Sequence, residues 1–295
     1  MSQPSPAGAM RSTPRQSPER EYAAHASRQI VLRTRGERHG PIVRVFSPSD
    51  VGQLVKPFVF LDHVDFIQSG GPMFKMHPHS GIATVTVLLS GDIRYEDTTG
   101  AAGSLTSGSV EWMNAGGGVW HDGYPEAAGR LRAYQLWVAL PAAIENDPAR
   151  SQYLPPEAVP RIGPARLILG EWEGVSSPVL APPGMNYLHV SLAPGEHWHY
   201  LPPAGHTVAW VHVSRGALLT AGTRLQDELA VFEESVASID LTAEGETELV
   251  VASAVKHPHE LVLGYYSVHT SAEALRLGEA GISRIGRLLR QQGRV

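Results

Sequence analysis

The chain has 295 residues, a formal net charge of −5 at pH 7, 30 glycines, 23 prolines and no cysteine. The lack of cysteine excludes disulfides, thiolate metal sites and a cysteine nucleophile, and no basic stripe indicates direct nucleic-acid binding. The sequence also has no apolar run of about 18 residues, so we expect no membrane span.

The sequence divides into four regions in chain order. Residues 1–27 contain Pro and Ser throughout and lack the apolar stretch of a signal peptide, which predicts a disordered N-terminal extension of a cytoplasmic protein. Residues 28–140 hold short strands separated by Gly, Asp and Ser turns, a spacing typical of an all-β sandwich or barrel. Residues 141–165 contain six prolines and are predicted to form a linker. Residues 166–295 form a second β region that ends in a weak helical pattern from Ser271.

The two β regions look like a degenerate duplication. The segment Ala83–Gly91 resembles Val208–Gly216 in its alternation of apolar residues and its final glycine. Counting back from these glycines places Pro202 and Ala204 where the first region has His77 and His79. The sequence therefore predicts one unit with a site and one that has lost it.

A His-x-His pair carries most of the functional information. His77 and His79 stand just before the alternating segment Thr84–Leu89, and residues i and i+2 of a strand point to the same face. Neutral imidazole is a preferred ligand of Fe, Cu, Ni and Zn. A third histidine, His121, follows three glycines at the start of a later strand. The alternative is that the pair flanks an exposed turn at Pro78, but the combination of three histidines favours a metal site.

These motifs together resemble the pirin family of the cupin superfamily. The resemblance covers residues 30–160 strongly and continues more weakly to the C-terminal helix. It depends on an ordered set of segments: Pro57–His63, His77–Gly81, Thr84–Thr86 with Gly91, Gly108–Met113, Ala115–Gly118, His121 and Gln135–Pro141.

Membership of this family implies two tandem cupin (double-stranded β-helix, jelly-roll) barrels with a short C-terminal helix. It also implies a metal-binding N-terminal domain over residues 28–140 and a degenerate C-terminal domain over residues 166–295. The implied metal ligands are His77, His79 and His121, with Fe(2+) as the expected metal and Ni, Cu, Mn or Zn as alternatives.

One departure from the family pattern concerns the anionic ligand. The glutamate of the family stands two residues after the third histidine, where this chain has Gly123, and the general cupin motif offers a second position, which is Ala83 here. Asp122 is a substitute to consider as ligand or base, although on an extended strand it points away from His121. No other catalytic residue is identified from the sequence.

The resemblance implies a quercetinase-type activity, flavonol 2,3-dioxygenation, with a small aromatic substrate such as a flavonol. The competing interpretation is a non-catalytic metal-binding regulator that acts through a protein partner, and the missing carboxylate favours it. Five residues could form an apolar wall for an aromatic substrate, although core packing is the favoured role for them: Phe58, Phe60, Met73, Phe74 and Trp120.

Overall fold

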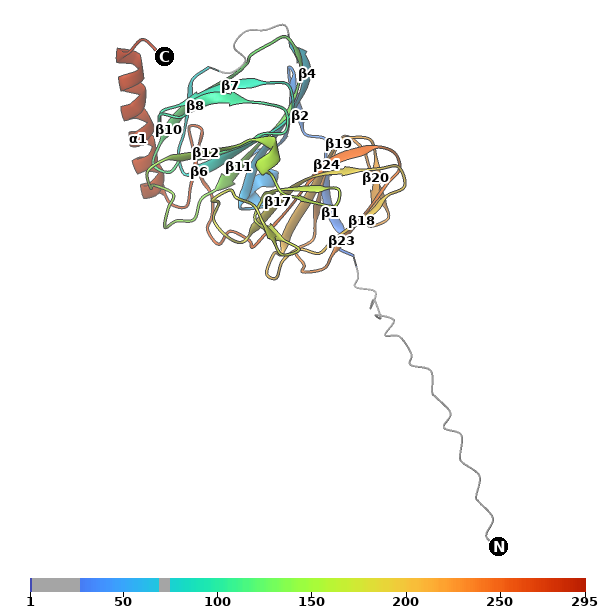
Figure 1. The fold of residues 1–295 in the computed structure, drawn as a ribbon. Helices are drawn as coiled ribbons and strands as arrows, with labels where there is room; N and C mark the ends of the chain where they lie inside the picture. Colours follow the sequence, from blue (N-terminus) through green and yellow to red (C-terminus); the bar gives the residue numbers. More distant parts are fainter. Residues whose placement is uncertain (2–26, 69–74) are drawn as a thin grey trace.

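The computed structural model describes residue 1 and residues 27–68 and 75–295, so most of the predicted N-terminal extension lies outside the described residues. The described chain is built from β-strands and one C-terminal helix, α1 (Ala272–Gln291), which begins after Ser271 as predicted. Figure 1 shows two β units side by side, with α1 on the outer side of the first. The predicted class, two tandem jelly-roll units of cupin type with a C-terminal helix, is confirmed.

The first unit pairs a large sheet with a small one. The strands of the large sheet, in spatial order, are β12 (Arg150–Leu154), β9 (Val110–Asn114), β6 (Ile82–Ser90), β11 (Gly129–Ala139), β4 (Phe58–Gln68), β3 (Ile42–Phe46) and β2 (Glu37–His39). The small sheet has the order β5 (His77–His79), β10 (Val119–Pro125), β7 (Ile93–Asp97) and β8 (Ala102–Leu105). A 3₁₀ turn (Val51–Gln53) precedes β4 and another (Pro156–Ala158) follows β12.

The second unit repeats this arrangement. Its large sheet has the order β1 (Ile30–Thr34), β22 (Leu229–Phe232), β19 (Val208–Arg215), β24 (Thr247–Ala254), β17 (Met185–Leu192), β14 (Ala165–Leu169) and β13 (Arg161–Ile162). Its small sheet has the order β18 (His197–Tyr200), β23 (Ile239–Ala243), β20 (Leu218–Thr220) and β21 (Thr223–Leu225). Two short hairpins complete the chain: β15 (Glu171–Trp172) with β16 (Val175–Ser176), and β25 (Val262–Gly264) with β26 (Ser267–His269).

The largest hydrophobic core lies between the two large sheets. Alternate residues of β6 and β9, among them Ala83 and Trp112, belong to the same buried cluster as Tyr187 and Trp210 of the second unit. The ring of Trp210 meets the ring of Phe58 edge-on, with centroids 5.7 Å apart. Because neighbouring residues on a strand point to opposite faces, the other residues of β6 and β9 face the interior of the first unit, where the site lies.

The interior of the second unit is filled, which explains why its His-x-His does not repeat the first. Its strand β18 pairs with β23 as β5 pairs with β10. On β18, Trp198 and Tyr200 point inward and are buried, whereas His197 and His199 are exposed. The count that placed Pro202 and Ala204 at these positions is wrong, because the chain between β18 and β19 is longer than between β5 and β6. The inward-facing positions of β18 are therefore Trp198 and Tyr200, one residue along from the histidines, and both imidazoles point outward.

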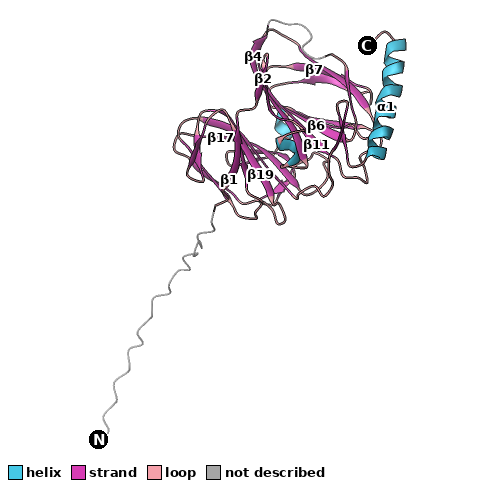
Figure 2. Ribbon diagram, turned by 180° about the vertical axis from the view of Figure 1, so that it is seen from behind, coloured by secondary structure: helices cyan, strands magenta, loops and turns pink. Residues whose placement is uncertain are grey.

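The predicted domain boundaries at residues 140 and 166 stay a prediction. Three segments pack on the unit to which these boundaries do not assign them. Strand β1 pairs with β22 in the sheet of the second unit. Strand β12, inside the predicted linker, pairs with β9 of the first unit. The C-terminal β25–β26 hairpin and α1 pack on the first unit, against β5, β6 and β10. Figure 2 shows α1 along the outer side of this unit. The C-terminal segment therefore lies beside the predicted metal site.

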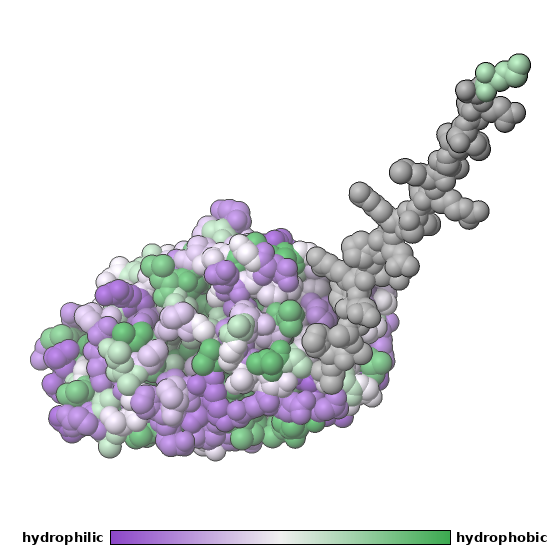
Figure 3. Space-filling model, turned by 90° about the horizontal axis from the view of Figure 1, so that it is seen from below, coloured by the Kyte–Doolittle hydropathy of each residue, from purple (hydrophilic) through white to green (hydrophobic). Residues whose placement is uncertain are grey.

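The described residues include no helix that is long and apolar enough to cross a membrane. On the face drawn in Figure 3, apolar residues lie in small separate patches among polar ones. Apolar side chains scattered in this way are normal on a protein surface.

Buried histidines between the units should make stability depend on pH. His189 and His212 are almost fully buried, and burial lowers the pKa of His189 to about 4 and that of His212 well below its usual value. The unfolded chain therefore binds protons at a higher pH than the folded chain. The free energy of unfolding should have its full value above pH 6.5 and decrease as the pH falls towards 4. The contribution of His189 to this decrease is on the order of 3 kcal/mol.

Urea unfolding between pH 7.5 and 4.5 measures this effect. The variant His189→Gln should lose less stability than wild type over this range, because it removes one proton acceptor from the unfolded state. A matched change at the half-exposed His39, His39→Gln, should keep the wild-type pH dependence. An identical slope for His189→Gln and wild type would contradict the prediction.

Candidate metal centre

The pairing of β5 with β10 brings the three predicted histidines together. In the register of this antiparallel pair, His77 stands opposite His121 and His79 stands opposite Val119. All three side chains point inward, as the i, i+2 spacing of the pair predicts. Among the described residues, these three are the group whose ligand atoms lie within 4.8 Å of one another.

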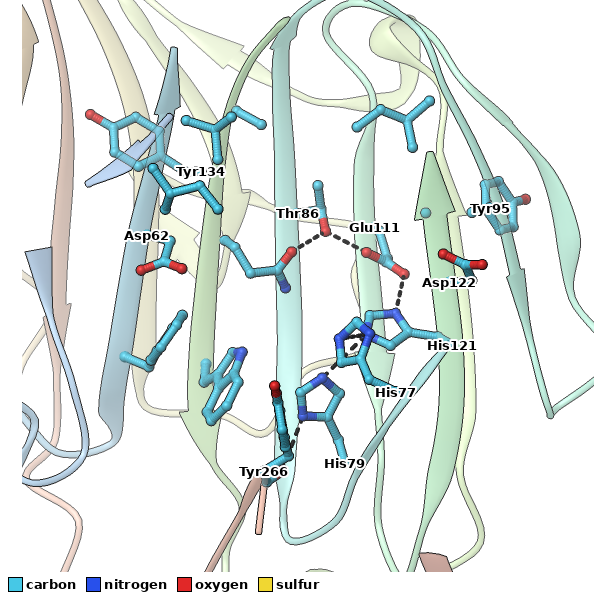
Figure 4. Close-up of a pocket in the computed structure, with 18 of the residues that line it drawn as sticks. Asp62, His77, His79, Thr86, Tyr95, Glu111, His121, Asp122, Tyr134 and Tyr266 are labelled. Carbon is cyan, nitrogen blue, oxygen red and sulfur yellow. Dashed lines mark hydrogen bonds and ion pairs between the residues drawn. The ribbon is translucent and has the colours of Figure 1, made fainter. Parts of the chain in front are cut away.

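The imidazoles converge through the same ring atom. The Nε2 atom of His121 lies 3.0 Å from Nε2 of His77 and 3.2 Å from Nε2 of His79 (Figure 4). Burial lowers the pKa of His77 to about 4 and that of His79 well below its usual value, and the neighbouring His121 adds to both shifts. The rings of His77 and His79 are therefore neutral at pH 7, which is the state that binds a metal ion.

The outer ring nitrogens face oxygen acceptors. Nδ1 of His77 donates to the backbone oxygen of Lys75 at 2.8 Å, and Nδ1 of His79 donates to that of Tyr266 at 3.1 Å. These bonds keep the proton on Nδ1 and leave Nε2 free, as is usual for metal-binding histidines. The donor set thus fits a divalent metal at the point where the Nε2 atoms meet.

A carboxylate that the sequence argument did not single out lies beside the third ligand. Glu111 is only 5% exposed, and its Oε1 lies 3.8 Å from Nδ1 of His121. Its Oε2 accepts a hydrogen bond from the hydroxyl of Thr86 on the neighbouring strand β6 (Figure 4). The signal for it in the sequence is a lone acidic residue within the apolar stretch Val110–Met113, a pattern that by itself predicts only a strand.

The positions considered for the family glutamate differ in what surrounds them. Gly123 lines the cavity, and a Cβ there would meet only Ile93 Cγ2, at 3.6 Å. Ala83 instead belongs to the core between the units, so a glutamate would not fit there. Asp122 lies apart from the three imidazoles in Figure 4; burial raises its pKa. Its role as a ligand or base stays a prediction that this position does not favour.

The histidines stand at one end of a cavity of about 590 Å³. Its aromatic wall is built from Phe60, which stacks on Trp137 with centroids 4.2 Å apart, and from Tyr266. Arg44 lies over the ring of Phe60 at 4.5 Å and pairs with Asp62 at 3.0 Å. An aromatic molecule of moderate size would fit this shape and lining.

The residues considered for an aromatic wall, for which core packing was the favoured role, have different positions. Of these, Phe60 lines the cavity, whereas Phe58 packs in the core between the units. Trp120 packs on α1, with its Nε1 donating to the backbone oxygen of Ile282 at 2.8 Å. Met73 and Phe74 lie outside the described residues. Trp137 and Tyr266 were missed, because they come from β11 and from the distant C-terminal hairpin.

The fold and the site define a bicupin with a three-histidine site in its first unit. The family model described as Pirin matches residues 41–138. The chain is 32% identical over 243 residues to the Pseudomonas aeruginosa protein named "Putative quercetin 2,3-dioxygenase PA2418", covering 76% of this chain and 84% of that protein. It is also 32% identical to a Caulobacter vibrioides protein named "Pirin-like protein", covering 74% and 76%. This chain belongs to the pirin family.

A solved structure agrees with this assignment at the level of the fold. It is a crystal structure of quercetin 2,3-dioxygenase from Acinetobacter baumannii, with a TM-score of 0.79 and 24% sequence identity. The match covers 88% of this chain and 98% of that one. The family model and the two relatives confirm the pirin resemblance seen in the sequence.

Proposed function

We propose that the protein is a metal-dependent dioxygenase of the quercetinase type, with Fe(2+) as its metal and a hydroxylated aromatic compound such as a flavonol as its substrate. The observation that carries this proposal is the meeting of three histidine Nε2 atoms at the end of an aromatic cavity. The names of the relatives support the same reaction class.

Each part of the site has a role in this reaction. His77, His79 and His121 would hold the metal, which when bound supplies Lewis acidity and electron transfer towards O₂. Trp137 meets the ring of His79 edge-on at 4.9 Å and stacks on Phe60, so these side chains form an aromatic wall for a substrate beside the metal position. Tyr266 fixes the orientation of His79 through its backbone oxygen and lines the cavity with its side chain.

Anaerobic loading with Fe(2+), followed by quercetin and O₂, tests the proposal. We expect flavonol loss and O₂ consumption in a one-to-one ratio, and neither in the metal-free protein. Loading with Ni, Cu, Mn or Zn in parallel identifies the metals that support turnover, since affinity alone does not select the correct metal. Stoichiometric iron without consumption of either reactant would contradict the proposal.

The second candidate function is a metal-binding regulator without turnover, acting through a protein partner. The glycine at the position of the family glutamate, Gly123, favours this alternative. The same experiment separates the two functions, because a regulator would bind metal with the same three histidines and leave the flavonol and O₂ unchanged.

A further inference from the structure

The three metal-binding histidines differ in the partner of their outer nitrogen, and this difference has a chemical consequence. Two of the Nδ1 atoms face neutral backbone oxygens, those of Lys75 and Tyr266. The third, that of His121, faces the carboxylate of Glu111 at 3.8 Å. Among the described residues that line the cavity, this carboxylate is the one paired with a ligand of the site.

We infer that Glu111 is the anionic partner of the metal centre, acting on the metal through His121 in a carboxylate–histidine–metal arrangement. With a metal on Nε2, His121 carries its proton on Nδ1, which faces Oε1 of Glu111 at 3.8 Å. A carboxylate in this place raises the basicity of the imidazole and offsets part of the metal charge. Glu111 is thus a positioning residue, and it takes over part of what the absent glutamate at position 123 would do.

The surroundings of Glu111 hold its carboxylate in this orientation. Its Oε2 accepts from the hydroxyl of Thr86, and Gln135 Oε1 lies 2.8 Å from the same hydroxyl. One hydroxyl proton cannot serve two acceptors, while Nε2 of Gln135 has no partner among the described residues. Turning the amide by 180° lets Gln135 donate to Thr86 and Thr86 donate to Glu111. A chain of hydrogen bonds then runs from Gln135 on β11 through Thr86 on β6 to the carboxylate of Glu111.

The burial of Glu111 supports a functional role over a purely structural one. A buried carboxylate is costly unless it is paired with a positive charge, and its hydrogen-bond partner, the Thr86 hydroxyl, brings none. A divalent metal on the three histidines would provide that charge at the far side of one imidazole ring. The inference rests on the metal site of the proposed function and not on its oxygenase activity.

Metal affinity measured by competition titration, with Ni(2+) and with anaerobic Fe(2+), tests the inference. The variant Glu111→Gln keeps the size of the side chain and should weaken both metals by about 10- to 100-fold. It should also shift the reduction potential of bound iron to more positive values, because an anion near the site stabilises Fe(III) more than Fe(II). A merely structural role would leave that potential unchanged.

The double variant Glu111→Gln/Gly123→Glu provides a rescue. Position 123 has room for a side chain that points to the same side as His121, so affinity should return to within about threefold of wild type. Asp62→Asn, the same chemical change at another buried carboxylate of the cavity, should keep wild-type affinity.

Two outcomes overturn the inference in distinguishable ways. Wild-type affinity and potential in Glu111→Gln would show that Glu111 does not act on the metal, while leaving the proposed function intact. A wild type that bound neither metal would overturn the metal site itself, and with it both the proposed function and the role of Glu111.

Discussion

Replacing His121 by alanine is expected to remove the metal from the protein. His121 Nε2 stands between the other two Nε2 atoms, at 3.0 and 3.2 Å, so its loss leaves two ligands without a third. Elemental analysis of protein purified without an affinity tag should fall from about one equivalent of metal to less than about a tenth. Loss of a group that hydrogen-bonds a metal ligand lowers affinity by up to roughly 100-fold, so loss of the ligand His121 itself should lower it by more. Any flavonol turnover should be abolished.

A second His-x-His in the chain gives the control for this experiment. The variant His199→Ala removes an exposed imidazole whose partner is Asp240, at 2.8 Å on the outside of the second unit. It should keep the full metal content, because the two motifs differ in which face of their strand the imidazoles occupy. His199→Ala should unfold within about 0.5 kcal/mol of wild type, as is usual for an exposed side chain, and a cooperative unfolding transition of His121→Ala would show that loss of the metal is not loss of the fold. Retention of one equivalent of metal in His121→Ala would show that the metal binds elsewhere.

The contrast between the two His-x-His motifs shows where sequence reasoning succeeded and where it stopped. On β5 the spacing of His77 and His79 predicts a shared face, and pairing with β10 brings His121 to that face. On β18 the same spacing places both histidines on a common face, but on the outer one. Which face of a strand points inward depends on how the strand is paired in its sheet. Because the connection before β19 is longer than the one before β6, a count along the chain does not show which residues of β18 point inward.

The parts of the site that escaped prediction come from non-local pairing. Tyr266 reaches the cavity because the C-terminal hairpin leaves the second unit and packs on the first, which no local pattern around residues 262–269 reveals. Glu111 escaped for another reason. Its strand alternates between the core of the two units, where Trp112 packs, and the interior of the first, where Glu111 points. Both faces are buried, so the alternation of polar and apolar residues that marks a half-exposed strand is missing.

Specific contacts hold the C-terminal segment against the first unit. Gly281 of α1 lies against the turn before β10, and a Cβ there would come 1.9 Å from the backbone oxygen of Gly117. Below the helix, Nε2 of His269 lies 3.0 Å from Oγ of Ser80, the residue after the ligand His79. Nδ1 of His269 bonds the buried carboxylate of Glu145 at 3.1 Å. These contacts join the C-terminal segment to residues next to both strands that carry the metal ligands.

The variant Gly281→Leu should therefore be strongly destabilising. The new side chain would overlap backbone atoms rather than a flexible side chain, so the helix must move away from the turn that precedes His121. Overpacking in a closed contact costs about 1–3 kcal/mol. Loss of the hydrogen bond from Trp120 to Ile282 should bring the total to about 3 kcal/mol or more. Thermal or urea unfolding measures the change in stability, and metal titration measures the accompanying loss of affinity.

The neighbouring position gives a matched control with the same added bulk. Ala280 is exposed on α1, so Ala280→Leu should change stability by no more than about 0.5 kcal/mol and leave metal affinity unchanged. If Gly281→Leu were as stable as Ala280→Leu, α1 would not be docked on the turn at Gly117. If it were unstable yet bound metal with wild-type affinity, the helix would support the fold without supporting the position of His121. The two measurements together therefore separate docking of the helix from its effect on the metal centre.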